Sequence, residues 1–256
     1  MSAMAIAWIV FGCVFGGALA GMVLRRVLPA HHLNQDSKDV VKLGTGLIGT
    51  MAALVIGLLI ASAKGSFDTQ ASELHQVAAD LVLIDRDLAH YGPEAQDARD
   101  AIRRMTAASL DLIWPENGVH SANLEAAKAA PAQIERVQDK IRDLAPRNDE
   151  QRELRARALQ LSGDVAQARW LLVGQLGSQA IPVPFLVVLV VWLVVIFVSF
   201  GLLSPPNTTV VVVLFICALS AAGAIFLILE MERPFEGLMK ISGAPMREAF
   251  SHLGQQ

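Results

Sequence analysis

The longest uncharged segment of this chain spans residues 170–229, sixty consecutive residues without aspartate, glutamate, lysine or arginine. A transmembrane helix needs about 20 mostly apolar residues, because each residue rises about 1.5 Å through a hydrocarbon layer about 30 Å thick. Pro205 and Pro206 lie within the segment, where they end a helix because proline lacks the amide hydrogen. The segment therefore predicts two transmembrane helices, at about 182–203 and 208–229.

The N-terminal part of the chain supplies two further apolar segments. Residues 1–24 carry no charge before Arg25 and Arg26, and residues 43–63 are uncharged as well. The first segment does not resemble a signal peptide, because it lacks a basic start and two arginines follow it instead of a cleavage site. We therefore predict transmembrane helices at about 5–24 and 43–63, and hence a membrane protein that crosses the bilayer four times.

The charged residues gather between the second and third predicted spans. Residues 64–169 hold 14 of the 21 lysines and arginines and 18 of the 24 aspartates and glutamates. Apolar residues there recur three and four positions apart, which is typical of packed helices, and no alternating pattern predicts a strand. We predict an all-α integral membrane protein with a helical bundle inserted between transmembrane helices two and three. Its parts are 1–63 with the first two transmembrane helices, 64–169 with the bundle, 170–229 with the last two transmembrane helices, and 230–256 with an amphipathic C-terminal segment.

The second predicted span continues without a proline into the bundle, so we expect one helix from about Val41 to His90. Small residues recur on it every four positions, which lets helix backbones approach closely in a membrane. The first span carries Gly12, Gly16 and Ala20 at the same spacing. Two arrangements remain open: the small residues of helices one and two pack on each other within one chain, or helix two packs against its own copies around an axis. The small residues of helix two are Gly49, Ala53, Gly57, Ala61 and Gly65.

The sequence contains none of the motifs that would predict an enzyme. Walker A, HExxH and GxSxG patterns are absent, and the adjacent His31 and His32 point in different directions, which disfavours a metal site. We therefore predict no enzymatic activity, cofactor or metal. Cys13 and Cys217 lie in predicted spans and imply no disulfide, and a net charge of −3 argues against nucleic-acid binding. The spans lack an unambiguous buried charge, which disfavours a secondary transporter but not a channel with an apolar gate.

Two segments at membrane boundaries combine charged, aromatic and glycine residues: IASAKGSFDTQASEL at 60–74 and LEMERPFEGLMKIS at 229–242. One interpretation is that they anchor the spans at the lipid headgroups. The other is a latch at the membrane exit, in which Arg233 pairs with Asp68 or Glu73, while the proline that follows ends the helix and turns the next apolar residues back. The candidate latch residues are Asp68, Glu73, Glu232, Arg233, Pro234, Phe235 and Gly237.

These two segments, together with DRDLAHYGPEAQDAR at 85–99 and LIWPE at 112–116, resemble the bestrophin-like family of bacterial membrane proteins. That family is distantly similar to bestrophins, which are pentameric anion channels with four spans and a large cytosolic helical part. Bestrophins also carry a Pro-Phe-Gly segment after the last span, which a glutamate interrupts here as PFEG at 234–237. The acidic calcium-binding run of eukaryotic bestrophins is absent, so the resemblance does not imply gating by calcium.

The resemblance implies a homo-oligomeric anion channel, a pentamer, whose second helix lines the pore and whose partners are membrane lipids and ions. It also implies a bacterial inner-membrane location with cytoplasmic termini and bundle, because basic residues beside the spans are nearly balanced between the two sides and do not decide the orientation. The alternative function is a non-conducting membrane adaptor or sensor whose bundle binds a protein partner. The candidate pore-lining residues, chosen because they lie off the stripe of small residues, are Met51, Leu54, Val55, Leu58 and Leu59.

Overall fold

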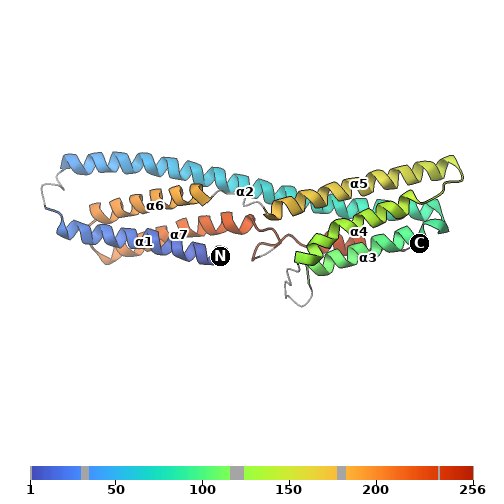
Figure 1. Ribbon diagram of the computed structural model, residues 1–256. Helices are drawn as coiled ribbons and strands as arrows, with labels where there is room; N and C mark the ends of the chain where they lie inside the picture. Colours follow the sequence, from blue (N-terminus) through green and yellow to red (C-terminus); the bar gives the residue numbers. More distant parts are fainter. Residues whose placement is uncertain (1, 30–34, 116–123, 178–182, 236, 256) are drawn as a thin grey trace. The chain divides into compact units, whose positions relative to one another are not determined.

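The computed structural model describes residues 2–29, 35–115, 124–177, 183–235 and 237–255. Every regular element within these ranges is a helix (Figure 1). The elements are α1 (Ala3–Val27), α2 (Gln35–Tyr91), the 3-10 helix η2 (Pro93–Ala95), α3 (Gln96–Ile113), α4 (Leu124–Arg142), α5 (Asp149–Gly177), α6 (Val183–Leu203), α7 (Thr208–Met231) and α8 (Ala244–His252).

The chain divides into two compact units, which we call the membrane unit and the bundle unit. The membrane unit comprises Met1–Phe67 and Gln179–Met239, and the bundle unit comprises Asp68–Ser178 and Lys240–Gln256. Helix α2 contributes its first part to the membrane unit and its last part to the bundle unit. Its continuity is the one predicted from a segment without proline.

Four helices, α1, α2, α6 and α7, are long and apolar enough to cross a membrane. They correspond to the four spans expected from the sequence, but two of them extend well past the expected bounds. Helix α1 continues through Arg25 and Arg26 to Val27, and α2 begins at Gln35, eight residues before residue 43. The additional residues are mostly polar or charged, so apolar composition marks the part of a helix that lies in hydrocarbon and not its ends.

Side-chain caps begin two of the spanning helices. The Ser2 hydroxyl accepts a hydrogen bond from the Ala5 amide at 3.2 Å at the start of α1. The Asn207 carboxamide oxygen accepts one from the Val210 amide at 2.8 Å at the start of α7. Each cap satisfies an amide that has no partner inside its helix. The α6–α7 connection therefore ends one helix at two prolines and starts the next at an asparagine.

Helices α1 and α6 make the closest helix contact in the membrane unit. A Cβ atom added to Gly21 would lie 2.2 Å from the carbonyl oxygen of Val198, and one added to Gly201 would lie 2.0 Å from that of Ala18. Gly17 also faces α6, at 3.2 Å from a Val194 methyl carbon. Glycine is required here because the two backbones occupy the space of a side chain.

The packing of small residues within one chain differs from the first of the two arrangements that the sequence left open. No neighbouring atom lies within 4 Å of a Cβ position built at Gly12 or Gly16 of α1. The same holds for Gly49, Gly57 and Gly65 of α2. The glycines that do pack in α1 follow Gly16 by one and five residues, and their partner is α6 instead of α2.

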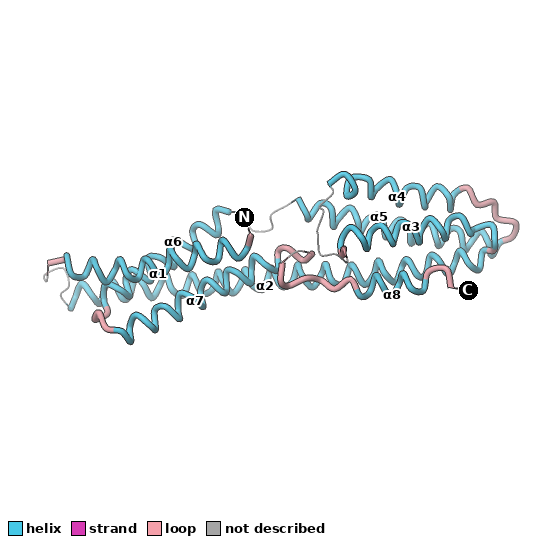
Figure 2. The backbone as a smooth tube through the Cα atoms, turned by 90° about the horizontal axis from the view of Figure 1, so that it is seen from below, coloured by secondary structure: helices cyan, strands magenta, loops and turns pink. Residues whose placement is uncertain are grey.

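The bundle unit packs α3, α4, α5, α8 and the last part of α2 around an apolar core (Figure 2). The three- and four-residue spacing on α2 is confirmed, because every residue of its predicted seam is buried. Gly92, with φ of 125°, ends α2, and Pro93 begins η2. The Gln151 side-chain amide of α5 donates to the carbonyl of Tyr91 at 2.8 Å. The buried residues of the α2 seam are Leu74, Val77, Leu81, Ile84, Leu88 and Tyr91.

Candidate functional site

The spanning part of α2 exposes its stripe of small residues. Gly49 is half-buried, and the other four members of the stripe are exposed on this chain. The apolar cluster that fills the membrane unit includes Ala52 as its single fully buried residue from α2. The remaining members of that cluster come from α1, α6 and α7. Helix α2 therefore lies on the other three helices along one face and leaves the opposite face uncovered by its own chain.

The five candidate pore-lining residues fall on two different faces of α2. Met51, Leu54 and Leu58 are 45%, 66% and 62% exposed. Val55 and Leu59 are half-buried and pack against the apolar cluster of the membrane unit. At about 100° per residue, the first three lie within about 60° of arc on the helix surface. The uncovered face is thus an apolar strip with small residues beside it.

A buried carboxylate organises the turn that follows α7. Glu230 is 4% exposed, and its carboxylate accepts a hydrogen bond from the Leu238 amide. Gly237 has φ of 79°, and a Cβ atom there would lie 2.0 Å from the same carboxylate oxygen. A side chain at this position would meet both steric strain and the carboxylate. The ERPFEG segment therefore turns back on the last residues of α7, with Glu230 holding the turn.

The structure places the candidate latch residues in both units. On the membrane unit, Glu232 and Phe235 are half-buried, Pro234 is buried, and Arg233 and Gly237 are exposed. On the bundle unit, Asp68 is exposed and Glu73 is half-buried. Because Arg233 belongs to one unit and the two acids to the other, the ion pair between them stays a prediction. Within the membrane unit, α2 and α7 meet at the membrane exit through a small apolar cluster of Ala63, Ile228 and Met231 with Phe67 against it.

The C-terminal segment is held on the bundle by Trp114, the tryptophan of the LIWPE motif. Its indole nitrogen donates a hydrogen bond to the carbonyl of Ile241 at 2.9 Å. A Cβ atom at Gly243 would lie 2.8 Å from the indole ring, so the ring rests on the backbone of this residue. Ile241 is buried, as expected of a residue that turns back after the last span, whereas Leu238 and Met239 are exposed.

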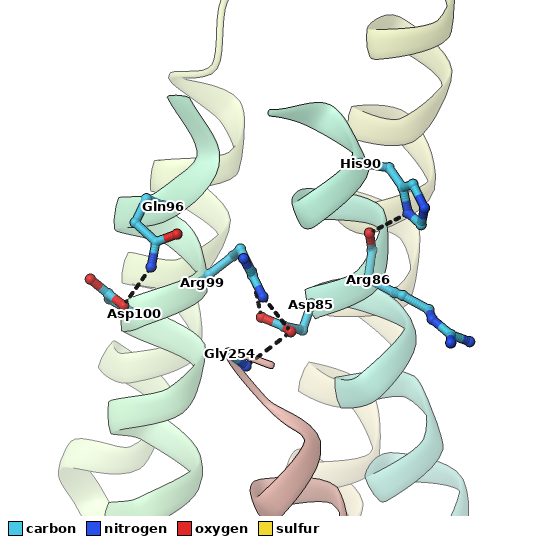
Figure 3. Close-up of polar contacts among 7 residues, drawn as sticks. All are labelled: Asp85, Arg86, His90, Gln96, Arg99, Asp100 and Gly254. Carbon is cyan, nitrogen blue, oxygen red and sulfur yellow. Dashed lines mark hydrogen bonds and ion pairs between the residues drawn. The ribbon is translucent and has the colours of Figure 1, made fainter. Parts of the chain in front are cut away.

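The other end of the C-terminal segment meets a buried ion pair (Figure 3). Arg99 of α3 donates from Nε and Nη2 to the two carboxylate oxygens of Asp85 on α2, at 2.9 and 3.0 Å. The Gly254 amide donates to the same carboxylate at 3.1 Å. Hydrogen bonding to Asp85 raises the pKa of the Arg99 guanidinium. The pair lies inside the DRDLAHYGPEAQDAR motif and joins α2, α3 and the C-terminal segment.

Sequence reasoning missed the roles of Glu230, Asp85 and Arg99. Glu230 lies in a quoted segment, but it was interpreted only as marking the membrane exit. The residues whose contacts reveal these roles, Leu238 and Gly254, are distant in sequence from their partners or follow no period. Among the described residues, no group of three or more His, Cys, Asp or Glu could hold a metal ion.

Four potential transmembrane helices and a helical bundle into which one of them continues define an all-α membrane protein. A family model described as the Bestrophin-like domain matches residues 12–246. The chain therefore belongs to the bestrophin-like family, as its motifs indicated. No curated protein matches the chain.

Solved structures share the fold of this chain at low sequence identity. Two crystal structures of variants of a bacterial bestrophin homologue from Klebsiella pneumoniae align with TM-scores of 0.60 each, at 16% and 15% identity. The alignments cover 94% of this chain and 96% and 97% of those chains. A crystal structure of a membrane protein variant aligns with a TM-score of 0.62 at 14% identity, over 96% of this chain and 97% of that one. At these identities the likeness shows the fold.

Proposed function

We propose that the chain forms an oligomeric ion channel, selective for anions, with α2 of each copy near the pore axis. The observation that carries the proposal is the uncovered face of α2. Met51, Leu54 and Leu58 are exposed on a helix whose other face packs on three neighbours of its own chain. Membership of the bestrophin-like family and the shared fold support a channel.

The uncovered face suits an axis because it combines small residues with an apolar strip. Small residues let helices from several copies approach closely where lipid provides no hydrophobic drive. An apolar constriction can gate a channel by excluding water, so a conducting pore does not require charged side chains along it. In this proposal Met51, Leu54 and Leu58 line the constriction, while Val55 and Leu59 hold α2 on its own chain.

The proposed location is the bacterial inner membrane, with the termini and the bundle unit in the cytoplasm. The resemblance to bestrophins supports this orientation. The same resemblance supports a pentamer, with lipids and the conducted ions as partners. Single-cysteine labelling from the outside of intact cells would test the orientation, because a cysteine at the exposed position Arg103 would react from outside only if the bundle unit were external.

The test of function uses the full-length protein in detergent and in liposomes. We expect a ring-shaped oligomer by electron microscopy and chloride flux that depends on the protein. Replacing Leu54 and Leu58 together with alanine widens an apolar constriction, so chloride flux should rise. The matched control replaces Val195 with alanine, because Val195 is an exposed apolar residue of α6 and lies outside the proposed pore.

A second variant tests the packing of α2 against its copies. Gly57→Ile places a bulky side chain where this chain itself has no atom within 4 Å. It should leave the protomer folded and weaken the oligomer, whereas Gly223→Ile at a similarly open position of α7 should not. A monomer without protein-dependent flux would overturn the proposal. A stable ring without flux, isolated with a bound protein, would favour the membrane adaptor or sensor instead.

A further inference from the structure

Three carboxylates on α2 lie seven residues apart inside the bundle unit: Glu73, Asp80 and Asp87. Seven residues are close to two helical turns, so the three side chains share one face of the helix. Asp80 and Asp87 are 4% and 7% exposed, and the Oε2 atom of the half-buried Glu73 is buried without a hydrogen-bond donor. This buried acidic line is unusual, since buried carboxylates are normally paired with a cation.

The three carboxylates differ in what they contact. Asp87 lies 3.4 Å from the guanidinium of Arg157 on α5. Asp80 accepts one hydrogen bond, from the neutral amide of Gln76 at 2.8 Å, and within the described residues it forms no ion pair. The charged group that faces Asp80 is Asp164 of α5, which repels it. Asp80 is therefore buried at the contact of two helices with a like charge opposite.

The surroundings of Asp80 favour its protonated form. Burial raises its pKa most, the repulsion from Asp164 raises it further, and the hydrogen bond from Gln76 lowers it. Burial also raises the pKa of Asp87, against the lowering effects of Arg157 and His90. Asp85 shows the contrast, because the same helix buries it with a two-pronged arginine contact and a backbone amide.

We propose that Asp80 and Asp164 form a proton-sensitive contact between α2 and α5, which tightens when Asp80 binds a proton and loosens when it is ionised. Protonation removes the desolvation cost of a buried charge and its repulsion by Asp164. It also supplies a hydroxyl donor that Asp164 can accept. The device lets the bundle unit respond to mild acid without any ligand other than the proton.

The direction of the pH effect follows from proton linkage. The folded bundle holds the proton on Asp80 more tightly than the unfolded chain does, because its pKa is raised on folding. This contribution to stability is complete below the ordinary aspartate pKa and is lost as the pH rises through the raised folded value. Other carboxylates of the bundle titrate as well, so the contribution of Asp80 is the difference between the wild type and an Asp80 variant.

The test compares wild type with Asp80→Asn as full-length protein in detergent, by hydrogen–deuterium exchange of α5 peptides at pH 5 and 7.5. Asparagine keeps the shape and the acceptor for Gln76 but cannot ionise. We expect wild-type α5 to be more protected at pH 5, after correction for the intrinsic exchange rate. Because one pKa unit corresponds to a tenfold change in equilibrium, a change in protection of about threefold to tenfold is expected. Asp80→Asn should show the higher protection at both pH values.

Two further variants separate this contact from general effects of removing a charge. Asp164→Asn removes the facing charge from an exposed position, so it should reduce the pH difference without unfolding the bundle. Asp85→Asn removes a paired charge five residues along the same helix and should lower protection at both pH values. The proposal is overturned if Asp80→Asn keeps the wild-type pH difference or lowers α5 protection at pH 7.5. An unchanged pH difference in Asp164→Asn overturns the role of the facing carboxylate.

Discussion

The indole nitrogen of Trp114 donates to the carbonyl oxygen of Ile241 at 2.9 Å, across a separation of 127 residues. The contact joins the end of α3 to the first residues after the ERPFEG segment. Two sequence motifs that looked independent, LIWPE and the C-terminal KISGAP, thus meet as the two sides of one contact. The C-terminal segment is anchored here and again at its end by Asp85.

The Trp114 contact predicts that Gly243→Ala destabilises the bundle unit. The added methyl group would lie 2.8 Å from the indole ring, so either the ring or the C-terminal backbone must move. Overpacking of this kind costs about 1–3 kcal/mol. Thermal unfolding of the full-length protein in detergent measures the change. Gly163→Ala in α5, where no atom lies within 4 Å, is the control and should be neutral or stabilising, since alanine favours a helix.

The turn after α7 predicts that Gly237→Ala is unfavourable for two reasons. Its φ of 79° strains an alanine, and the methyl group would overlap the Glu230 carboxylate. We expect a loss of stability of about 1 kcal/mol or more. The readout is the protection of the Leu238 amide from hydrogen exchange, which should fall. Gly223→Ala within α7 is the control, and equal effects of the two substitutions would contradict the assigned role of Glu230.

The α1–α6 contact predicts opposite outcomes for glycines on two faces of α1. Gly21→Ala forces the backbones apart, because its methyl group would lie 2.2 Å from the Val198 carbonyl oxygen. A loss of about 1–3 kcal/mol is expected, measured as a lower midpoint of thermal unfolding in detergent. Gly16→Ala meets no atom of its own chain and should leave this midpoint within about 0.5 kcal/mol of the wild type.

The buried ion pair predicts that single substitutions are worse than the double one. Arg99→Met leaves Asp85 charged and buried, and breaking such a pair typically costs about 3–5 kcal/mol. Asp85→Leu combined with Arg99→Met removes both charges and should recover much of that loss. Thermal unfolding of the four proteins forms a double-mutant cycle. A double variant as unstable as the sum of the singles would show that the two charges act independently.

The continuity of α2 and its buried seam could be predicted because both depend on local sequence. The absence of proline and the three- and four-residue spacing of Leu81, Ile84 and Leu88 are visible in one segment. The role of Glu230 could not be predicted in the same way. A carboxylate that holds a turn follows no period, and its function depends on the positive φ of Gly237 seven residues later.

The faces of the spanning helices show the same division. The sequence displays Gly12 and Gly16 at regular spacing, but the structure packs Gly17 and Gly21 against α6. Spacing alone shows where small residues could allow close approach. It does not show which neighbour approaches, because that depends on the rotation of one helix against another. The candidate pore-lining residues are divided for the same reason, with Val55 and Leu59 turned toward the chain's own core.

The sequence by itself determined that this is an all-helical membrane protein of the bestrophin-like type, because an apolar segment of about 20 residues has no stable place in water. It also determined the seams of the bundle, since helical period is a property of the chain. Only the tertiary structure decided which faces are covered. It brought Trp114 to Gly243, Asp85 to Gly254, and Asp80 into reach of the charge on Asp164. Such contacts depend on how residues distant along the chain pack together, which no local pattern specifies.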